Sequence, residues 1–417
     1  MKELFFIHDT LDNRISYYLL AFFLMALPFE HFFSEILLTC FAVHTLIQLK
    51  KDKFRKLRNK AVWVIASIFF LNLIAIIYSN YPSEGFKDVD HQLGILLFPV
   101  CFSVTNIDFK KYKLSFLKIF ALACTVTIVC LYIDVFYIIY YFHLPFFSIV
   151  SKPFINQNFS APIGLHATYL SMYVTLSIST FLYFFFRSPK LKNWKYIFLT
   201  VILFAGLVQL SSRAVFISTF IIVIITIPAF LLNGKRRLQF FLISFLTFLV
   251  IILAITNIGS LKKRYISDLE NDLTENGVTP DLSKTRAARW NLEMGLISNS
   301  PMIGYGSGSE KYILKEKYFE KKFYVSYLLE LNSHNQYLSF LINTGVFGLL
   351  LYLYILYFGF SSAIKNRDFL FISFLILVAI VSISENILDV NKGIFFYSFF
   401  FSFFHLSTSK ENASSPL

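Results

Sequence analysis

The chain has few charged residues and few cysteines for its length. Only 15% of its 417 residues are charged and four are cysteine, whereas 56% are hydrophobic and 19% are aromatic. This composition excludes an ordinary soluble globular protein and implies a surface that meets lipid. The cysteines fall inside apolar segments, without the spacing of a metal site or of a disulfide pair, and we expect small buried side chains there. They are Cys40, Cys101, Cys124 and Cys130.

The net charge of +13 does not indicate nucleic acid, because the basic residues lie in short loops between apolar runs. Their clusters lie at 50–60, 110–113, 187–195, 235–237 and 365–367. The alternate loops carry far fewer basic residues, so the positive-inside rule places the clusters and both termini in the cytoplasm. No small-residue cleavage site follows the first apolar run, and no cleaved signal peptide is expected.

Apolar runs predict an all-α integral membrane protein with about 12 transmembrane helices, since a helix needs roughly 20 residues to cross the hydrocarbon core. The expected spans are 15–28, 31–49, 61–79, 89–106, 114–140, 165–186, 194–210, 214–232, 238–258, 335–360, 369–385 and 391–407. One straight helix over 196–232 would be about 55 Å long, too long for a single crossing. We therefore predict two helices joined by a tight turn at Leu210-Ser211-Ser212-Arg213.

The polar part of the chain is concentrated in one segment outside the cytoplasm. The predicted organisation is transmembrane helices one to nine in 1–258, a large loop carrying part of the site in 259–334, transmembrane helices ten to twelve in 335–407, and a disordered cytoplasmic tail in 408–417. Within the loop, a helix is predicted from Thr285 to Asn299, ended by Pro301 and the glycines that follow. No internal repeat is visible.

Two groups of arginines are candidates for binding an anion. Arg213 lies at the outer end of a span beside two serines, where it either extends to lipid phosphates or grips the phosphate of a ligand. On the predicted helix, Arg286, Arg289, Trp290 and Glu293 share one face. The structural alternative is a membrane-surface helix in which Trp290 anchors at the interface and Arg289 pairs with Glu293.

His334 is the candidate general base. Ser333 and Gln336 match a capping box at the start of the tenth span, which would place His334 in the first turn of the helix. The helix dipole there favours the neutral imidazole that a general base requires, and free N–H groups favour a nearby phosphate.

Other polar motifs have structural explanations. The segment 301–308 contains spaced glycines but follows a helix, so it predicts a turn and not a dinucleotide site. Two groups carry metal-ligating side-chain types, Asp88 with Asp90 and His91, and Glu385 with Asp389 on one helical face. Acidic boundary loops are common in membrane proteins, and we predict no metal. His166 either caps its span at the interface or reaches the cavity of His334.

Taken together, these motifs resemble the O-antigen ligase family, which includes O-antigen ligases, related polymerases and protein glycosylating enzymes. The resemblance covers most of the chain. It depends on the order of Ser212-Arg213, of Arg286 four residues before Trp290, of Pro301-Met302-Ile303-Gly304-Tyr305-Gly306, of His334-Asn335-Gln336-Tyr337-Leu338, and of Thr344-Gly345-Val346-Phe347-Gly348. It implies a membrane-embedded glycosyltransferase of the C type with its large loop in the periplasm.

The resemblance further implies an inverting, metal-independent transfer, without a cofactor, of a glycan from undecaprenyl pyrophosphate to an acceptor hydroxyl such as that of lipid A-core. The reaction would take place at the periplasmic face of the bacterial inner membrane. His334 would be the general base. Arg213, Arg286 and Arg289 would bind the pyrophosphate, and Trp290, Gly304, Gly306 and Asn335 would support the loop.

Two alternatives stay open. A polysaccharide polymerase of the same family differs only in its acceptor, which residue types do not separate, although a single large loop favours a ligase. A polytopic transporter would instead place charges at the midplane in repeated halves, whereas here they cluster at the outer boundary. Membrane lipids are expected partners and nucleic acid is not. Glycan identity and oligomeric state are not readable from the sequence.

Overall fold

The computed structural model describes residues 4, 6–29, 31–187, 194–273 and 285–408. Within these ranges the chain is helical and no strand occurs, which confirms the all-α prediction. The first half contains α2 (Leu11–Ala26), α3 (His31–Ile47), η1 (Lys51–Arg58), α4 (Lys60–Ala75), α5 (Pro82–His91), α6 (Leu93–Val104), α7 (Phe109–Tyr141), η2 (Phe146–Val150), η3 (Lys152–Phe154), α8 (Gln157–Ser160), η4 (Ala161–Ile163) and α9 (Ala167–Arg187).

The second half contains α10 (Trp194–Leu210), α11 (Arg213–Ile221), η6 (Ile222–Thr226), α12 (Ile227–Leu231), α13 (Lys235–Asn257), α14 (Gly259–Lys262), η7 (Lys263–Ser267), α15 (Asp268–Leu273), α16 (Arg286–Asn299), α17 (Glu310–Glu320), α18 (Tyr324–Leu328), α19 (Gln336–Lys365), α20 (Phe369–Val381) and α21 (Asn391–Thr408). Residues 409–417 of the predicted tail, residues 188–193 of the 187–195 loop and residues 274–284 of the large loop lie outside the described residues, and Thr408 is the last residue of α21.

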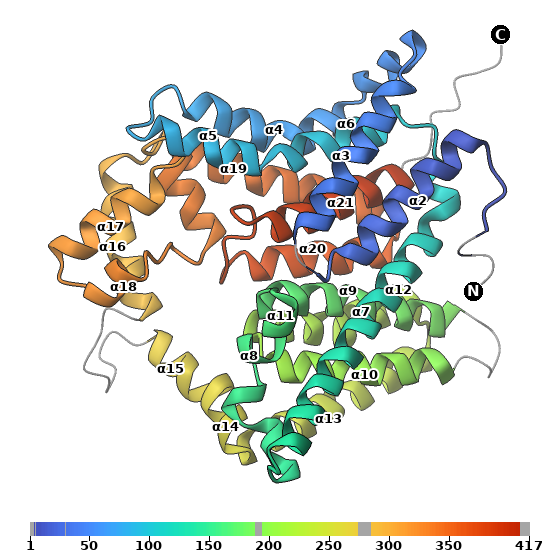
Figure 1. Ribbon diagram of the computed structural model, residues 1–417, viewed down its shortest axis with the longest axis vertical. Coiled ribbons are helices and arrows are strands. Elements are labelled where there is room, and N and C mark those ends of the chain that lie inside the picture. Colours follow the sequence, from blue (N-terminus) through green and yellow to red (C-terminus); the bar gives the residue numbers. More distant parts are fainter. Residues whose placement is uncertain (1–3, 5, 30, 188–193, 274–284, 409–417) are drawn as a thin grey trace.

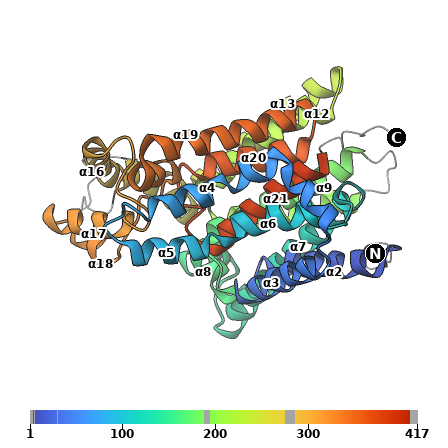
Figure 2. The same cartoon turned by 90° about the horizontal axis from the view of Figure 1, so that it is seen from above.

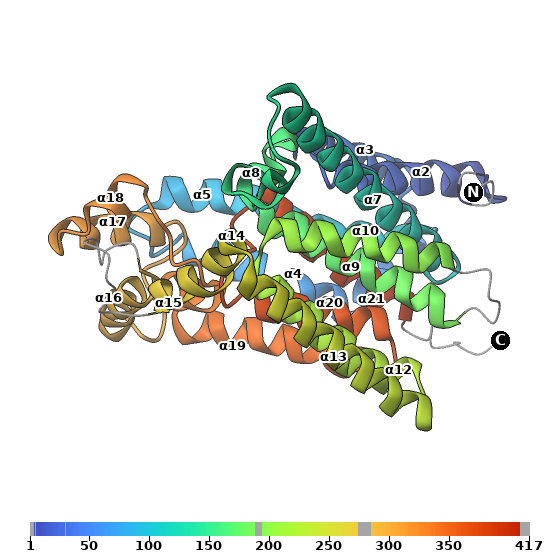
Figure 3. The same ribbon diagram turned by 90° about the horizontal axis from the view of Figure 1, so that it is seen from below.

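Several long helices, among them α10, α13 and α19, run in roughly the same direction (Figure 3). The short helices α16, α17 and α18 gather with α5 at one end, whereas α2 and α12 lie toward the other (Figures 1 and 2). The polar loop therefore forms one end of a helical bundle.

Five stretches of the described chain are long and apolar enough to cross a membrane: Phe109–Tyr141, Ala167–Arg187, Arg213–Leu231, Lys235–Asn257 and Gln336–Lys365. Shorter apolar helices accompany them, including α4, α10 and α20. The chain is therefore a multi-pass membrane protein. The count of twelve spans and the sides of the membrane on which the loops lie stay predictions.

Aromatic packing around α21 holds the bundle together. Phe399 of α21 is fully buried, and its ring lies 5.5 Å from that of Phe98 and 5.4 Å from that of Phe23. Phe400, one residue on, packs 4.9 Å from Phe120 of α7. Such ring pairs add specific geometry to their burial, so α2, α6 and α7 are fixed against one central helix.

Several local predictions are confirmed. The chain turns between α10 and α11 at the predicted place, with Ser211 in the left-handed region at a φ of 51°. The helix predicted at 285–299 is α16, and Thr285 caps it by accepting a hydrogen bond from the Ala288 N–H. In α19, Gly345 interrupts the helical geometry with a φ of 65°.

Other predictions are corrected. The span predicted at 89–106 is two helices, α5 and α6, which meet at Gln92, whose side chain accepts a 2.6 Å hydrogen bond from Asn72. Glu385 and Asp389 do not share a helix, because they lie in turns between α20 and α21. Cys40 and Cys130 are exposed and not buried, since their helix faces point away from the core.

Candidate functional site

His334 lies in the loop that leads into α19, outside the helix. Its backbone is in the left-handed region with a φ of 46°, a conformation that costs free energy for a residue other than glycine and that clusters at functional sites. The His334 N–H donates to the Asn332 side chain at 3.2 Å. Its ring Nδ1 lies 3.3 Å from Oε2 of Glu385. The loop thus presents an imidazole paired with a carboxylate.

The predicted capping box is wrong. α19 begins at Gln336, and its cap is Asn335, whose side chain accepts hydrogen bonds from the N–H groups of Tyr337 and Leu338 at 3.0 and 3.3 Å. The Ser333 hydroxyl donates elsewhere, to Asn386 Oδ1 at 3.0 Å. His334 therefore lies one residue before the cap, and its chemistry depends on Glu385 and not on a place in the first turn.

Buried polar groups from distant parts of the chain fix this loop. Glu310, at the start of α17, accepts hydrogen bonds from the Ser333 N–H at 3.0 Å and from the Asn386 side chain at 3.1 Å. Asn386 in turn accepts from the Asn335 N–H at 2.7 Å. All four residues are at least nine-tenths buried. Because such a network rigidifies only when its members are satisfied, the backbone around His334 has one defined position.

α16 holds the same loop from the other side. Arg289 donates to the Asn332 carbonyl at 2.9 Å, and Trp290 donates from its indole N–H to the Ser333 carbonyl at 2.9 Å. Arg289 is only 4% exposed. No Arg289–Glu293 ion pair exists among the described residues. Both side chains thus hold the backbone directly before His334, and neither matches the membrane-surface alternative.

Glu385 is the acidic residue around which the charged groups of the site are arranged. Besides His334, its carboxylate accepts a hydrogen bond from the Thr168 hydroxyl at 3.4 Å. Burial alone would raise the pKa of Glu385, but the hydrogen bond and charge of His334, together with the charges of His166 and Arg286, hold this pKa below its usual value. Glu385 is therefore an ionised partner for the imidazole.

Arg286 and Arg213 lie on the cationic side of the site. Burial lowers the pKa of the Arg286 guanidinium, an effect that the charges of Glu385 and Asp272 oppose. Arg213 opens α11 directly after the Ser211 turn and forms an ion pair with Asp272 of α15. Its Nη1 is buried without a hydrogen-bond partner within the described residues. An unused donor beside Arg286 can receive an anionic ligand.

His166 stands just before α9, next to this group. Its Nδ1 accepts a hydrogen bond from the Thr168 N–H at 3.3 Å, as expected of a residue that caps a helix. Burial lowers the pKa of the His166 imidazole, and the charge of Glu385 opposes this shift. The neutral form of His166 is therefore favoured near pH 7. It is a neighbour of the His334–Glu385 pair.

The glycine-rich turn locks the loop to α19. Gly304 has a φ of 65°, and a Cβ there would lie 2.4 Å from the Ile342 carbonyl oxygen; Gly345 likewise has no room against the Met302 carbonyl. Gly306 has a φ of 93° and lies against Ser79 of the α4–α5 turn. These glycines therefore allow close backbone contacts of the turn with α19 and with the end of α4.

Residues 198–353 of the chain match the sequence profile of a family described as O-Antigen ligase. This part of the chain is similar to the O-antigen ligase family. No curated protein sequence matches the chain. The matched part runs from α10 to the middle of α19 and so carries Arg213, Arg286 and His334. The partner carboxylate Glu385 lies beyond it.

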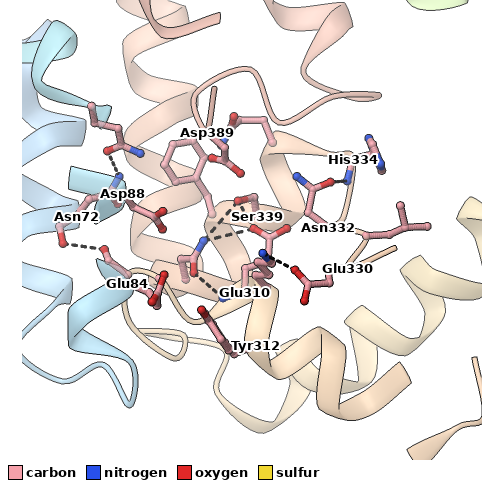
Figure 4. A pocket seen from close by; sticks show the side chains of 18 residues that line it. Asn72, Glu84, Asp88, Glu310, Tyr312, Glu330, Asn332, His334, Ser339 and Asp389 are labelled. Atoms are coloured by element: carbon pink, nitrogen blue, oxygen red, sulfur yellow. Dashed lines mark hydrogen bonds and ion pairs between the residues drawn. The ribbon is translucent and has the colours of Figure 1, made fainter. Parts of the chain in front are cut away.

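A cavity of about 410 Å³ is bordered by His334 (Figure 4). Asp88 of α5, Glu310 and Asp389 surround its interior. Burial within protein and the charge of Glu310 raise the pKa of Asp88 to about 6 and that of Asp389 well above its usual value. Both side chains remain accessible, because they border the cavity.

The two predicted groups of metal-ligating types do not assemble as clusters. Among the described residues, no set of three or more histidine, cysteine or acidic side chains is arranged to hold a metal ion. Asp88 faces the cavity, Glu385 pairs with His334, and Asp389 accepts from Asn386 at 2.7 Å. Sequence reasoning missed Asp272 and the pairing of Glu385, since both are contacts between residues far apart in the chain.

Proposed function

We propose that the protein transfers a glycan from undecaprenyl pyrophosphate to an acceptor hydroxyl, in the manner of an O-antigen ligase, at the periplasmic face of a bacterial inner membrane. The observation that carries this proposal is the His334–Glu385 pair, which adjoins Arg213 and Arg286 at the polar end of a membrane-embedded bundle. Lipid A-core is the proposed acceptor.

The pair has the geometry of an oriented general base. When Nδ1 of His334 donates its hydrogen to Glu385 at 3.3 Å, Nε2 is left with the lone pair that accepts a proton. The acceptor hydroxyl gives its proton to Nε2 while its oxygen bonds to the anomeric carbon. The bond from that carbon to the pyrophosphate oxygen breaks, the pyrophosphate leaves with the electron pair, and the configuration is inverted.

The cations suit the leaving group. Outside the cytoplasm no nucleotide sugar is at hand, so a lipid pyrophosphate must both activate and anchor the glycan. Arg286 and the free Nη1 of Arg213 supply hydrogen bonds to the charge that develops there. The two arginines stabilise the departing pyrophosphate, and the proposed mechanism includes no metal. Arg289 belongs to the loop support, where it holds the Asn332 carbonyl.

A genetic experiment separates the candidate functions. Surface lipopolysaccharide from a deletion strain is run on a gel beside strains complemented with the intact gene, with His334→Ala, or with His143→Ala, an exposed histidine outside the site. We expect the deletion and His334→Ala strains to lose the polysaccharide ladder and to accumulate polymer on the lipid carrier. A core capped with single repeats would indicate a polymerase, and an unchanged ladder in the deletion strain contradicts both readings.

Purified full-length protein tests the chemistry and separates it from transport. With undecaprenyl pyrophosphate-linked glycan as donor, Arg213→Ala and Arg286→Ala should raise the KM for donor, whereas His334→Ala should bind donor and fail to transfer. Arg236→Ala, an exposed residue of α13, is the matched control. Carrier release without glycan transfer to any acceptor, or full activity of His334→Ala, would refute the mechanism.

A further inference from the structure

We infer that the acidic cavity beside His334 binds the acceptor sugar and selects one that is uncharged or carries an amino group, against sugars bearing carboxylate or phosphate. This inference rests on the proposed function and adds the place and charge class of the acceptor. It depends on the position of the cavity, its lining and its unbalanced charge.

The position follows from the stereochemistry of displacement. In an inverting transfer the incoming hydroxyl and the departing pyrophosphate lie on opposite sides of the anomeric carbon. His334 borders the cavity, whereas Arg213 and Arg286 do not. His334 therefore touches the cavity and, through Glu385, adjoins Arg286. If the arginines hold the leaving group, the cavity is where the attacking hydroxyl must come from.

The lining has the chemistry of a sugar site. Amide side chains of Asn72, Gln92 and Asn343 border the cavity together with the three carboxyl groups around its interior. Amides and carboxylates offer donors and acceptors to hydroxyl groups. Tyr312, also in the lining, stacks on Tyr81 with ring centroids 4.9 Å apart. The volume of about 410 Å³ lies within the range of about 300–1,000 Å³ typical of small-molecule sites.

The charge of the cavity is unbalanced. Glu330 is paired with Lys311 and Lys315. By contrast, no lysine or arginine pairs with Asp88, Glu310 or Asp389 within the ranges that the structure describes. Burial is the main cause of the raised pKa values of Asp88 and Asp389, and the charge of Glu310 adds to it in both cases. An anionic sugar would add to this repulsion, whereas a hydroxyl or ammonium group would relieve it.

Asp88 and Asp389 are the selective groups. Glu310 is committed to the loop, since its oxygens accept from Ser333, Asn386 and Ser339. Asp88 and Asp389 are instead accessible, and they come from opposite ends of the sequence to the same space. Asp389 also accepts a hydrogen bond from Asn386, which binds the His334 loop. Asp88 is therefore the position at which a substitution should change acceptor binding without disturbing the His334–Glu385 pair.

Saturation-transfer NMR on the full-length protein in lipid nanodiscs tests the inference by binding alone. The probes are methyl glucoside, methyl glucosaminide and methyl glucuronide. We expect the first two to bind and the glucuronide to bind at least about tenfold more weakly. Asp88→Asn and Asp389→Asn should weaken binding of the glucosaminide by about tenfold and should reduce the discrimination against the glucuronide.

Asp90→Asn is the matched control, because Asp90 lies on α5 but does not line the cavity. Each variant must show a cooperative thermal unfolding transition, which establishes that it is folded. Absence of saturation transfer from every probe in the unsubstituted protein overturns the inference, as does equal binding of the glucuronide or indifference to both substitutions. The two proposals fail separately: if His334→Ala still transfers glycan, the general-base mechanism falls, but pyranoside binding in the cavity stands.

Discussion

Replacing Glu385 by glutamine should slow transfer while leaving both substrates bound. The carboxylate lies 3.3 Å from His334 Nδ1, and an effective dielectric constant of about 20 gives the imidazolium form about 5 kcal/mol of stabilisation at that distance. His334 is 30% exposed and Glu385 13% exposed, so solvent reduces the difference to about 2–3 kcal/mol. This corresponds to a loss of about 30- to 160-fold in kcat.

The assay measures kcat for transfer from lipid-linked donor by purified protein. Thr168→Val removes the other hydrogen bond of Glu385 without removing its charge and should lower kcat little. Ser384→Ala, next in sequence, is the neutral control. A Glu385→Gln enzyme with unchanged kcat would refute the role of the His334–Glu385 pair in transfer.

Three further predictions concern stability and positioning. Gly345→Ala should destabilise the protein by about 3 kcal/mol, since its Cβ would lie 2.2 Å from the Met302 oxygen at a positive φ, whereas Gly295→Ala, in open space on α16, should not lower the melting temperature. Asn335→Ala should cost about 1 kcal/mol in thermal unfolding and lower kcat with KM little changed, and Asn335→Asp should restore both. Asp88 binds its proton more tightly when folded, so stability should fall as pH rises from about 4 to about 6, and Asp88→Asn should flatten that part of the melting curve against pH.

The sequence correctly predicted those structural features that depend on interactions between residues close together in the chain. The turn at Ser211 follows from the length of the apolar run, and the end of α16 follows from Pro301 and the glycines beyond it. Both outcomes depend on residues within a few positions of each other. Arg286 and His334 were singled out in the same way, from their places at the boundaries of predicted helices, and their roles stay predictions.

Long-range contacts could not be predicted. Ser333 looked like a cap, but Glu310 and Asn386 bind it, so Asn335 takes over the end of α19. Asn386 is 53 residues from Ser333 in the sequence, and Asp272 is 59 residues from Arg213. Nothing in the periodicity of one chain specifies such pairs, because they depend on how the helices are arranged in the bundle.

The mutual approach of Gly304 and Gly345 has a consequence for how this protein can change over evolution. At this contact the glycine-rich turn is fastened to α19 by backbone alone, with Tyr305 and Gly306 donating their N–H groups to the Ile342 and Asn343 carbonyls, each at 2.8 Å. The intervening chain, which includes α17 and α18, is thereby a closed insert anchored at both ends. Substitutions on the surface of this insert can therefore change which acceptor binds, while the contact between the glycine-rich turn and α19 keeps His334 in place.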